Sequence, residues 1–455
     1  MIALTHAYYL SEDAKEQPIM RPYAPLGILY ISAYLQQQNI KHLVFDSTFS
    51  SFQEQIAFIS DNNIKLLGLY VNLMTKLNAL RLMAAIKSNK QLKDCKVVLG
   101  GPDLRHNAKE YLLAGADMLV LGEGEQTFFE IAQGFATEQR LLSDISGTAY
   151  LNTADELVVT EERTLLKNLN ELPMPARHTI DISRYLQVWK KHHGYSMLSV
   201  STMRGCPYTC KWCSRAVYGG TYRRRSAAIV VQELELLKQG YGVDRIWFVD
   251  DVFTISHKWL REFCDELKKK QLTVSYEIIT RADRMNAEVI ALLKESGCFR
   301  VWIGAESGSQ KIIDAMDRRV EVQQVQQMIQ KTIAAGIEAG TFIMLGYPGE
   351  VKQDIKATIQ HLINAKPSTY TITVAYPIAG TPLYNQVQDS LQSAEPWHKR
   401  TDRDLDFKRE HSKQYYIWAV KWVNNAVRAH AQSNPLKKIK HSVLSKIAQL
   451  VMLIV

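Results

Sequence analysis

Short apolar segments alternate with longer amphipathic segments through residues 1–135. The apolar segments have the length of strands, and the amphipathic segments repeat their apolar residues with the period of a helix. Strands are expected at 1–7, 41–46, 66–71, 96–100 and 118–122, and helices at 26–37, 52–61, 77–88, 108–114 and 125–132. This βαβα order predicts a Rossmann-like α/β domain, whose parallel sheet is covered by helices on both faces. A ligand of such a sheet binds beyond the carboxyl ends of the strands.

The same alternation resumes at residue 196 and continues to about residue 390. Strands are expected at 197–202, 245–249, 274–280, 301–304, 340–345 and 371–375, and helices at 227–238, 258–269, 287–295, 322–335 and 352–365. Six strand–helix repeats predict a partial (β/α)6 barrel, in which the site lies at the carboxyl ends of the strands. Polar residues stand at those ends: Asp250, Asp251, Arg281, Glu306, Ser307 and the segment 346–350.

Two further segments complete the predicted organisation. Residues 136–195 form a linker, with a short hairpin at 145–150 and 156–160 and a proline-stiffened stretch at 168–176. Residues 391–455 form a helical C-terminal extension, with a helix at 412–432 and an apolar end that follows a lysine cluster. A basic segment followed by an apolar end can lie on an anionic membrane, or it can pack on the barrel and close its open side.

Charge is distributed unevenly along the 455 residues. The net charge is +9, but the chain after Glu410 has no acidic residue and seven basic ones, which leaves +2 for everything before it. A nearly neutral body argues against a nucleic-acid partner. No secretory signal and no apolar run of about 18 residues is present, so we expect a cytoplasmic protein, with peripheral contact to the inner membrane face through the tail as the alternative.

Three of the six cysteines stand within eight residues, at Cys206, Cys210 and Cys213. Three thiolates at this spacing can hold a metal, and no fourth cysteine or histidine follows nearby. A structural zinc site usually closes four ligands from two short hooks. We therefore favour an iron–sulfur cube in which one iron has no protein ligand and is open to chemistry. The other cysteines are scattered in apolar surroundings, which fits a reducing cytosol.

Glycine and small polar residues follow the strands of the N-terminal sheet. They occur at Asp46–Thr48, Asn72–Thr75, Gly100–Pro102 and Gly122–Glu125. Glycines there allow a flat or bulky ligand to approach the backbone closely, although any such sheet also needs glycine turns.

The segments 25–35, Val97–Pro102 and Gly122–Glu125 resemble, in order and spacing, the cobalamin-binding domain of one branch of the radical S-adenosylmethionine (SAM) enzymes. The resemblance implies cobalamin at the sheet edge, in contact with these residues: Asn72, Leu73, Met74, Thr75, Gly100, Gly101, Gly122, Glu123 and Gly124. The Asp-x-His-x-x-Gly signature that supplies a histidine to cobalt is absent, and neither His6 nor His42 stands in it. The ligand of the lower cobalt face therefore stays unassigned, and a sheet domain without its cofactor is the alternative.

The cysteine loop is similar to the Cys-x3-Cys-x2-Cys motif of the radical SAM superfamily, with Trp212 in the aromatic place before the third cysteine. Five further segments match the family in order: 222–226, 248–253, 304–309, 346–350 and 376–382. The resemblance implies a 4Fe–4S cluster on the three cysteines, SAM on the open iron, and a 5′-deoxyadenosyl radical. It places Glu306 and Ser307 beside SAM, Arg281 at its carboxylate, and Asp250 in the same pocket. For Arg223–Arg225, binding of a substrate carboxylate and a purely structural contact stay open.

The leading functional hypothesis is a cobalamin-dependent radical SAM methyltransferase that methylates an unactivated carbon of a small, hydrophobic substrate. It would need an electron donor such as flavodoxin or ferredoxin. The alternatives are an anaerobic oxidative or ring-forming cyclase of the same branch, and a sensor that binds cobalamin or an iron–sulfur cluster without turnover. Methyl transfer consumes a second SAM and yields S-adenosylhomocysteine, whereas cyclisation does not, and a sensor makes no 5′-deoxyadenosine.

Overall fold

The computed structural model describes residues 1–137 and 144–455, which form two compact units. The first unit comprises Met1–Pro207, Ser214–Ile246 and Glu395–Asp402, and the second comprises Tyr208–Cys213, Trp247–Ala394 and Arg403–Val455. Residues 138–143, near the start of the predicted linker, lie outside the described residues. The chain changes unit inside the cysteine loop, so Cys206 belongs to the first unit, and Cys210 and Cys213 belong to the second.

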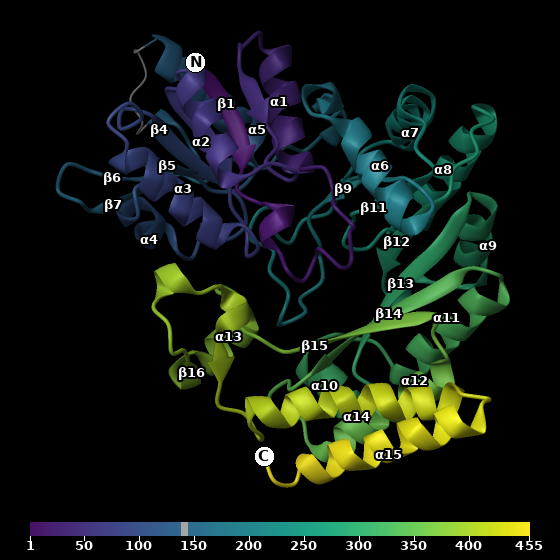
Figure 1. Cartoon of the computed structure of the whole chain (residues 1–455). Helices are drawn as coiled ribbons and strands as arrows, with labels where there is room; N and C mark the ends of the chain where they lie inside the picture. The colour runs from purple at the N-terminus through teal and green to yellow at the C-terminus, as the bar shows by residue number, and fades with distance from the viewer. Residues whose placement is uncertain (138–143) are drawn as a thin grey trace. The chain divides into compact units, whose positions relative to one another are not determined.

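The first unit is built on a seven-stranded sheet with the order β2-β1-β3-β4-β5-β6-β7 (Figure 1). The strands are β1 (Ile2–His6), β2 (Leu43–Phe45), β3 (Leu66–Tyr70), β4 (Lys96–Gly100), β5 (Met118–Val120), β6 (Thr148–Leu151) and β7 (Leu157–Val159). The first five strands are parallel, and β6 and β7 add an antiparallel edge. The helices are α1 (Leu26–Gln37), α2 (Phe52–Asp61), α3 (Lys76–Ser88), α4 (Ala108–Leu113) and α5 (Gly124–Thr137). The predicted Rossmann-like domain is confirmed.

Side chains that alternate along the strands supply two apolar cores, one on each face of this sheet. On β4, Val97 and Leu99 pack with residues of α2, α3 and α4, such as Ile59 and Leu82. Val98, between them, packs on the opposite face with residues of α1 and α5. Strands that are buried on both faces have continuous runs of apolar residues in the sequence. The predicted positions of these strands are therefore close to the observed ones.

The segment predicted as a linker contributes more structure than expected. The predicted hairpin is present as β6 and β7, and it continues the sheet because β6 pairs with β5. A helix, α6 (Ile182–His193), was not predicted. Asp181 caps its N-terminus by accepting a hydrogen bond from the N–H of Arg184 at 3.2 Å, and Gly194 ends it in a left-handed conformation.

The second sheet has six strands in the order β15-β14-β13-β12-β11-β8, as expected when successive βα units add strands on one side. The strands are β8 (Met197–Val200), β11 (Arg245–Phe248), β12 (Tyr276–Thr280), β13 (Cys298–Glu306), β14 (Glu338–Leu345) and β15 (Thr369–Val374). The helices after them are α7 (Ala227–Tyr241), α8 (His257–Lys269), α9 (Ala287–Glu295), α10 (Gln310–Ala315), α11 (Val322–Ala334) and α12 (Lys352–Ala365). This arrangement confirms the predicted partial barrel.

Short elements surround the cysteine loop and the last strand. They are β9 (Met203–Arg204), β10 (Arg223–Arg224), α13 (Pro382–Val387), β16 (Leu391–Gln392) and β17 (Asp406–Phe407). The antiparallel pairs β9–β10 and β16–β17 each form a two-stranded sheet.

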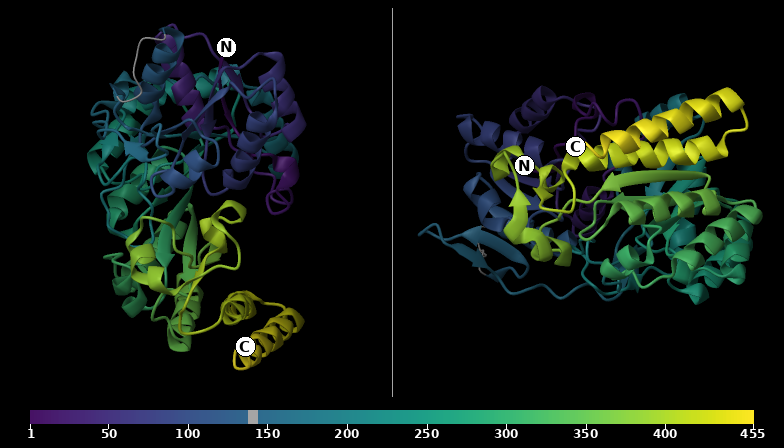
Figure 2. Two further views of the ribbon diagram at one scale, coloured as in Figure 1. Left: turned by 90° about the vertical axis from the view of Figure 1, so that its left-hand side faces the viewer. Right: turned by 90° about the horizontal axis from the view of Figure 1, so that it is seen from below.

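Two long helices end the chain, α14 (Lys413–Ala431) and α15 (Pro435–Val451). Figure 2 shows them side by side in both views. In the second unit α14 contacts α12, β14 and β15, so part of the C-terminal extension does pack on the barrel. No helix within the described ranges is long and apolar enough to cross a membrane.

A buried charge cluster ties α7 to the segments before it in the first unit. The Glu233 side chain is fully buried, and it forms ion pairs with Arg177, at 2.7 Å, and with Arg225. Burial alone would raise the pKa of Glu233, but the two guanidinium groups hold the pKa below its ordinary value. The carboxylate is the partner shared by two buried cations.

Replacing Glu233 with glutamine should lower the free energy of unfolding by about 3–5 kcal/mol, because two buried guanidinium groups lose their counter-charge. Urea unfolding measures the change. The matched control is Glu235→Gln on the same helix, where the side chain is partly exposed and the loss should be about 0.5 kcal/mol or less. An equal loss of unfolding free energy in the two variants would contradict the role of Glu233 as the counter-charge of the two arginines.

Candidate functional site

The loops predicted to bind cobalamin lie at neighbouring strand ends in the first unit. Tyr70, Gly100 and Val120, at the ends of β3, β4 and β5, are in register with one another. The segments that follow, Asn72–Thr75, Gly100–Gly101 and Gly122–Gly124, therefore leave one edge of the sheet. This is the edge at which ligands of parallel α/β sheets bind.

The loop after β3 is a turn held by Asn72. Its side-chain oxygen accepts hydrogen bonds from the N–H groups of Met74, at 2.8 Å, and Thr75, at 3.1 Å. The hydroxyl of Thr75 accepts from the N–H of Asn72 at 2.9 Å. Leu73 and Met74 form the tip of the turn, where the Met74 side chain is exposed. The turn thus presents an apolar side chain at the ligand edge.

Glycine is suited to two positions at this edge of the sheet for two different physical reasons. A Cβ on Gly101 would lie 2.0 Å from the carbonyl oxygen of Val71, and the residue has a φ of +131°, so only glycine fits. A Cβ on Gly100 would meet nothing within 4 Å. Gly100 thus has open space beside its backbone, which fits a bulky group lying on the strand ends.

The two histidines of this unit that the sequence considered for cobalt are already hydrogen-bonded. His6 contacts Asp46 through Nε2 at 2.9 Å and Ser47 through Nδ1 at 3.1 Å. His42 contacts Ser32 through Nε2 at 2.8 Å and the carbonyl of Ile40 through Nδ1 at 2.9 Å. Neither ring has a nitrogen available, which agrees with the missing histidine signature.

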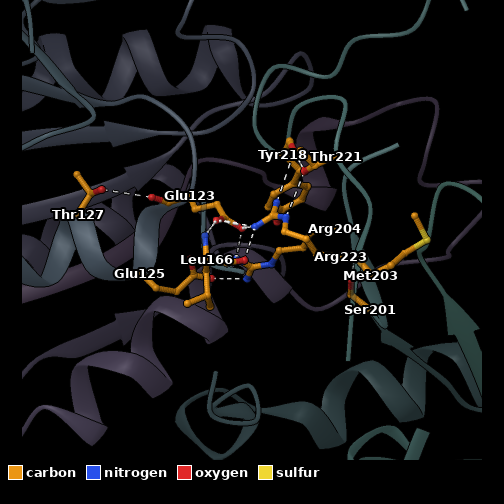
Figure 3. Close-up of polar contacts among 10 residues, drawn as sticks. All are labelled: Glu123, Glu125, Thr127, Leu166, Ser201, Met203, Arg204, Tyr218, Thr221 and Arg223. Atoms are coloured by element: carbon orange, nitrogen blue, oxygen red, sulfur yellow. Dashed lines mark hydrogen bonds and ion pairs between the residues drawn. The ribbon is translucent and has the colours of Figure 1, made fainter. Parts of the chain in front are cut away.

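The carboxylate of Glu123 is occupied by groups of the chain itself (Figure 3). It accepts hydrogen bonds at 2.9 Å from each of three donors: Arg204, Arg223 and the backbone N–H of Leu166. Burial alone would raise the pKa of Glu123, but the two guanidinium groups hold the pKa below its ordinary value. The geometry gives Glu123 a structural contact, while the backbone of Gly122 and Gly124 beside it stays at the ligand edge.

Arg204 joins this cluster to the cysteine loop. Its guanidinium binds Glu123 at 2.9 Å and Glu125 at 2.5 Å, and its side chain is 6% exposed. Arg204 pairs across β9–β10 with Arg223, so Glu123 bridges both ends of the loop. At the loop base, Gly205 has a φ of +81°, and a Cβ there would lie 2.0 Å from the carbonyl oxygen of Thr221.

The arginine run Arg223–Arg225 makes internal contacts, which favours the structural alternative over substrate binding. Arg223 binds Glu123, and Arg225 binds Glu233. Arg224 donates to the hydroxyl of Thr202 at 3.0 Å.

In the second unit, two buried arginines point at the sulfur of Cys210. Arg281 and Arg318 each place Nη1 3.6 Å from Sγ. Arg281 also donates to the carbonyl of Arg318 at 2.7 Å and pairs with Asp283 at 2.8 Å. Both guanidinium groups therefore donate toward the one cysteine sulfur that lies in this buried part of the loop.

The backbone of the cysteine loop is anchored on both sides. The N–H of Lys211 donates to the carbonyl of Met316 at 3.1 Å, and the carbonyl of Lys211 accepts from the N–H of Leu383 at 2.9 Å. Trp212 packs against an apolar cluster that includes Met316, Tyr347 and Leu383. The predicted aromatic position therefore holds the loop against the barrel, through contacts with protein side chains.

Glu306 lies on an irregularity of β13. It has a φ of +62°, and the register between β13 and β14 shifts between Gly304 and Glu306. The carboxylate is 3.8 Å from Arg318, and burial raises the pKa of Glu306, partly offset by Arg318 and Arg281. A left-handed glutamate at a strand end is the kind of strain that collects at functional sites.

The remaining predicted residues have separate environments. Ser307 contacts the hydroxyl of Thr358 on α12 at 3.2 Å, and its own hydroxyl accepts from the N–H of Ser309 at 3.1 Å. Asp250, just after β11, is buried, whereas Asp251 is exposed. The structure thus brings Arg281 and Glu306 together around Arg318, and places Ser307 in the α12 contact.

The donor set fits an iron–sulfur cluster with one open iron. Within the described ranges, no three Cys, His, Asp or Glu side chains converge as they would around a single metal ion. The ligands of a cube bind different irons and so do not converge on one ion. The cysteine spacing fits such a cluster on Cys206, Cys210 and Cys213, and the two arginine contacts at Cys210 are compatible with it.

Arg318, Arg204 and Glu125 are the residues of these sites that the sequence did not single out. Arg318 stands in the run Asp317–Arg319, where three charged residues give the pattern of a solvated loop. Its burial comes from packing of the loop between α10 and α11 and has no local signal. Arg204 stands at the start of the cysteine stretch, and Glu125 ends the segment Gly122–Glu125, but neither position indicates that the two side chains meet.

Comparisons with known proteins match both domains of the chain. Residues 200–362 match the sequence profile of the radical SAM superfamily, and residues 21–132 match that of the B12 binding domain. An uncharacterized methyltransferase of Pyrococcus horikoshii is 27% identical over 410 residues, which are 88% of this chain and 86% of that protein. The anaerobic magnesium-protoporphyrin IX monomethyl ester cyclase of Cereibacter sphaeroides is 25% identical over 285 residues, which are 61% of this chain and 45% of that protein.

A solved structure shares the fold over its whole length. The radical SAM methyltransferase TsrM of Kitasatospora setae, with cobalamin and a 4Fe–4S cluster bound, has a TM-score of 0.74 at 15% identity and covers 99% of both chains.

The chain is a radical SAM protein with an N-terminal B12-binding domain. It belongs to the cobalamin-binding branch of the radical SAM enzymes, whose cofactors are a 4Fe–4S cluster, SAM and cobalamin.

Replacing Arg204 with methionine should destabilise the first unit by about 3–5 kcal/mol, because Glu125 and Glu123 lose a buried counter-charge. Since Arg204 is two residues before Cys206, we also expect iron content after anaerobic reconstitution to fall. Unfolding curves and iron analysis of the same samples measure the two effects.

The matched control for that variant is Arg163→Met. Arg163 forms a half-buried pair with Glu130 at 2.6 Å in the same unit, away from the cysteine loop. The Arg163→Met variant should have a lower free energy of unfolding than the wild type and should retain its iron. Retention of iron in Arg204→Met, at a stability equal to that of the control, would contradict a role of Arg204 in positioning the loop.

The loop after β14 contains a buried carboxylate, Glu350. One oxygen accepts from the N–H of Gly346 at 2.6 Å and closes the turn, and the other has no hydrogen-bond partner. Burial raises the pKa of Glu350 to about 8 from 4.5, with a smaller contribution from Asp354. Between these two values the folded chain holds a proton that the unfolded chain has lost, so the free energy of unfolding falls as the pH rises.

Glu350→Gln keeps an acceptor for Gly346 and cannot ionise. It should therefore remove a slope of up to about 1.4 kcal/mol per pH unit from the unfolding free energy between about pH 5 and pH 8. Urea unfolding at several pH values measures it, with Glu338→Gln, an exposed carboxylate on β14, as the control. Parallel pH curves for wild type and Glu350→Gln would contradict the burial effect.

Proposed function

We propose that this enzyme is a cobalamin-dependent radical SAM methyltransferase that methylates a carbon of a small, apolar substrate. The observation that carries the proposal is the similarity to the methyltransferase of Pyrococcus horikoshii, which extends over 88% of this chain and so includes both cofactor domains. The cluster and SAM supply a carbon-centred radical when bound, and cobalamin carries a methyl group.

The residues of the chain hold and orient these groups. Cys206, Cys210 and Cys213 bind the cluster, and Arg281 and Arg318 balance the negative charge at Cys210. Glu306, with its neighbour Ser307, faces SAM from the end of β13. The strand-end backbone at Gly100, Gly101 and Gly122–Gly124 leaves room for the corrin ring. The protein's contribution is positioning and the exclusion of water.

A ring-forming or oxidative reaction is the second candidate. It is supported by the similarity to the magnesium-protoporphyrin cyclase, although that match covers only 45% of the cyclase. The substrate named for that protein is a magnesium-protoporphyrin ester. An electron donor such as a flavodoxin or ferredoxin is proposed for either reaction.

The test is anaerobic reconstitution with iron, sulfide, cobalamin, a chemical reductant and SAM labelled in its methyl group. We expect bound cobalt, 5′-deoxyadenosine, and S-adenosylhomocysteine whose formation requires bound cobalamin. The matched control, Cys210→Ser, should lose 5′-deoxyadenosine and keep bound cobalt.

The second candidate predicts 5′-deoxyadenosine without S-adenosylhomocysteine. Absence of S-adenosylhomocysteine from protein that holds both cluster and cobalamin would overturn methyl transfer.

A further inference from the structure

The last helix, α15, turns its small residues inward and its large apolar residues outward. Ser445 and Ala448 are the buried residues of this helix, and His441 contacts Asn425 of α14 at 2.9 Å. A different set of side chains is exposed: Leu436, Ile439, Val443, Ile447 and Leu450, with exposures from 43% to 78%. A helix of a soluble domain ordinarily buries its apolar stripe against the core.

The exposed residues form one continuous stripe. They follow one another at steps of three or four positions, the spacing that places side chains on a single helix face. We name these five residues the outer stripe. It runs the length of α15, on the side opposite the contact with α14, and Figure 2 shows α15 as the outer of the two helices on the second unit.

Lysines surround the outer stripe. Lys440 is four positions after Leu436, and Lys446 is three after Val443, so helix geometry places them beside the stripe. Lys437 and Lys438 stand in the first turn, and all four side chains are exposed. Within the described ranges none of the four forms an ion pair, and no acidic residue occurs after Glu410. The surface is apolar along its centre and positive at its margins.

The apolar centre and positive margins of this surface favour one binding partner over another. Contact with a second copy of the chain would bring its lysines against the same lysines, because a twofold interface uses one patch twice. A lipid surface with anionic headgroups offers acyl chains to the stripe and phosphates to the lysines. Four lysines within the 17 residues of α15 favour a position at the surface over one across the bilayer.

We propose that α15 docks this protein on an anionic membrane, lying parallel to the surface with the outer stripe in the headgroup–acyl boundary. The proposal concerns where the enzyme resides and is independent of the reaction that it catalyses. Each lysine near an anionic surface strengthens binding roughly fivefold at moderate salt.

The experiment is flotation of the full-length, anaerobically reconstituted protein with vesicles. One preparation contains phosphatidylcholine and phosphatidylglycerol in equal amounts, and the other contains phosphatidylcholine alone. We expect the wild type to float with the anionic vesicles, to bind the neutral vesicles at least about tenfold more weakly, and to be released as salt rises.

Two variants separate the apolar from the electrostatic contribution. Ile439→Ser/Val443→Ser/Ile447→Ser should reduce binding more than about tenfold. Lys440→Glu/Lys446→Glu should reduce binding to anionic vesicles at least about 25-fold, from two lysines at roughly fivefold each. The matched control is Ile333→Ser/Val159→Ser/Ile417→Ser, which removes the same side-chain types from exposed positions outside α15. It should float like the wild type.

Circular dichroism and sedimentation equilibrium accompany each variant. Equal flotation of the outer-stripe variant and its control, or no flotation of folded wild type, overturns the proposal. A wild-type dimer that becomes a monomer in the outer-stripe variant, with no vesicle binding, also overturns it and assigns the stripe to contact between copies. Flotation needs no turnover, so its failure is distinguishable from failure of the proposed methyl transfer.

Discussion

The pairing of buried arginines with carboxylates is the interaction on which the cysteine loop depends. Arg204 immediately precedes the loop and Arg223 immediately follows it. Glu123 binds both arginines at 2.9 Å. Two like charges at adjacent positions of a two-stranded pair repel each other unless a counter-charge lies between them. Glu123 therefore holds the two ends of the loop together. Gly205 allows the backbone at the start of the loop to lie close to the carbonyl of Thr221 near its end.

A second pair of arginines sets the charge at the other end of the loop. Arg281 and Arg318 converge on the sulfur of Cys210, and Arg318 also approaches Glu306. Buried cations at this density need polar partners, and the Cys210 sulfur, Asp283 and Glu306 are the side chains that contact them. In the proposed function, these contacts place two guanidinium groups beside one of the three cysteines that would hold the cluster.

Periodicity located the elements well because the strands of both sheets are apolar on successive positions and the helices are amphipathic. The helices at 26–37, 52–61, 287–295 and 352–365 have the predicted bounds. The sequence missed α6, because proline-rich chain precedes it and its apolar face is narrow. It also treated Glu123 as a cofactor contact and left Arg223–Arg225 open, since a charged residue at a strand end gives no sign of its partner.

The sequence by itself determined the two α/β domains and the three cysteines, because alternating hydrophobicity and a fixed spacing are local properties of a chain. Tertiary structure alone decided which charges meet. Arg204 and Glu125 are 79 positions apart, and Arg318 and Cys210 are 108 apart, so no local pattern links them. It also decided that α15 buries its small residues against α14 and leaves its large apolar ones in solvent. The sequence alone cannot show which residues of α15 are buried, because a helix has two faces and only its packing decides which face is turned inward.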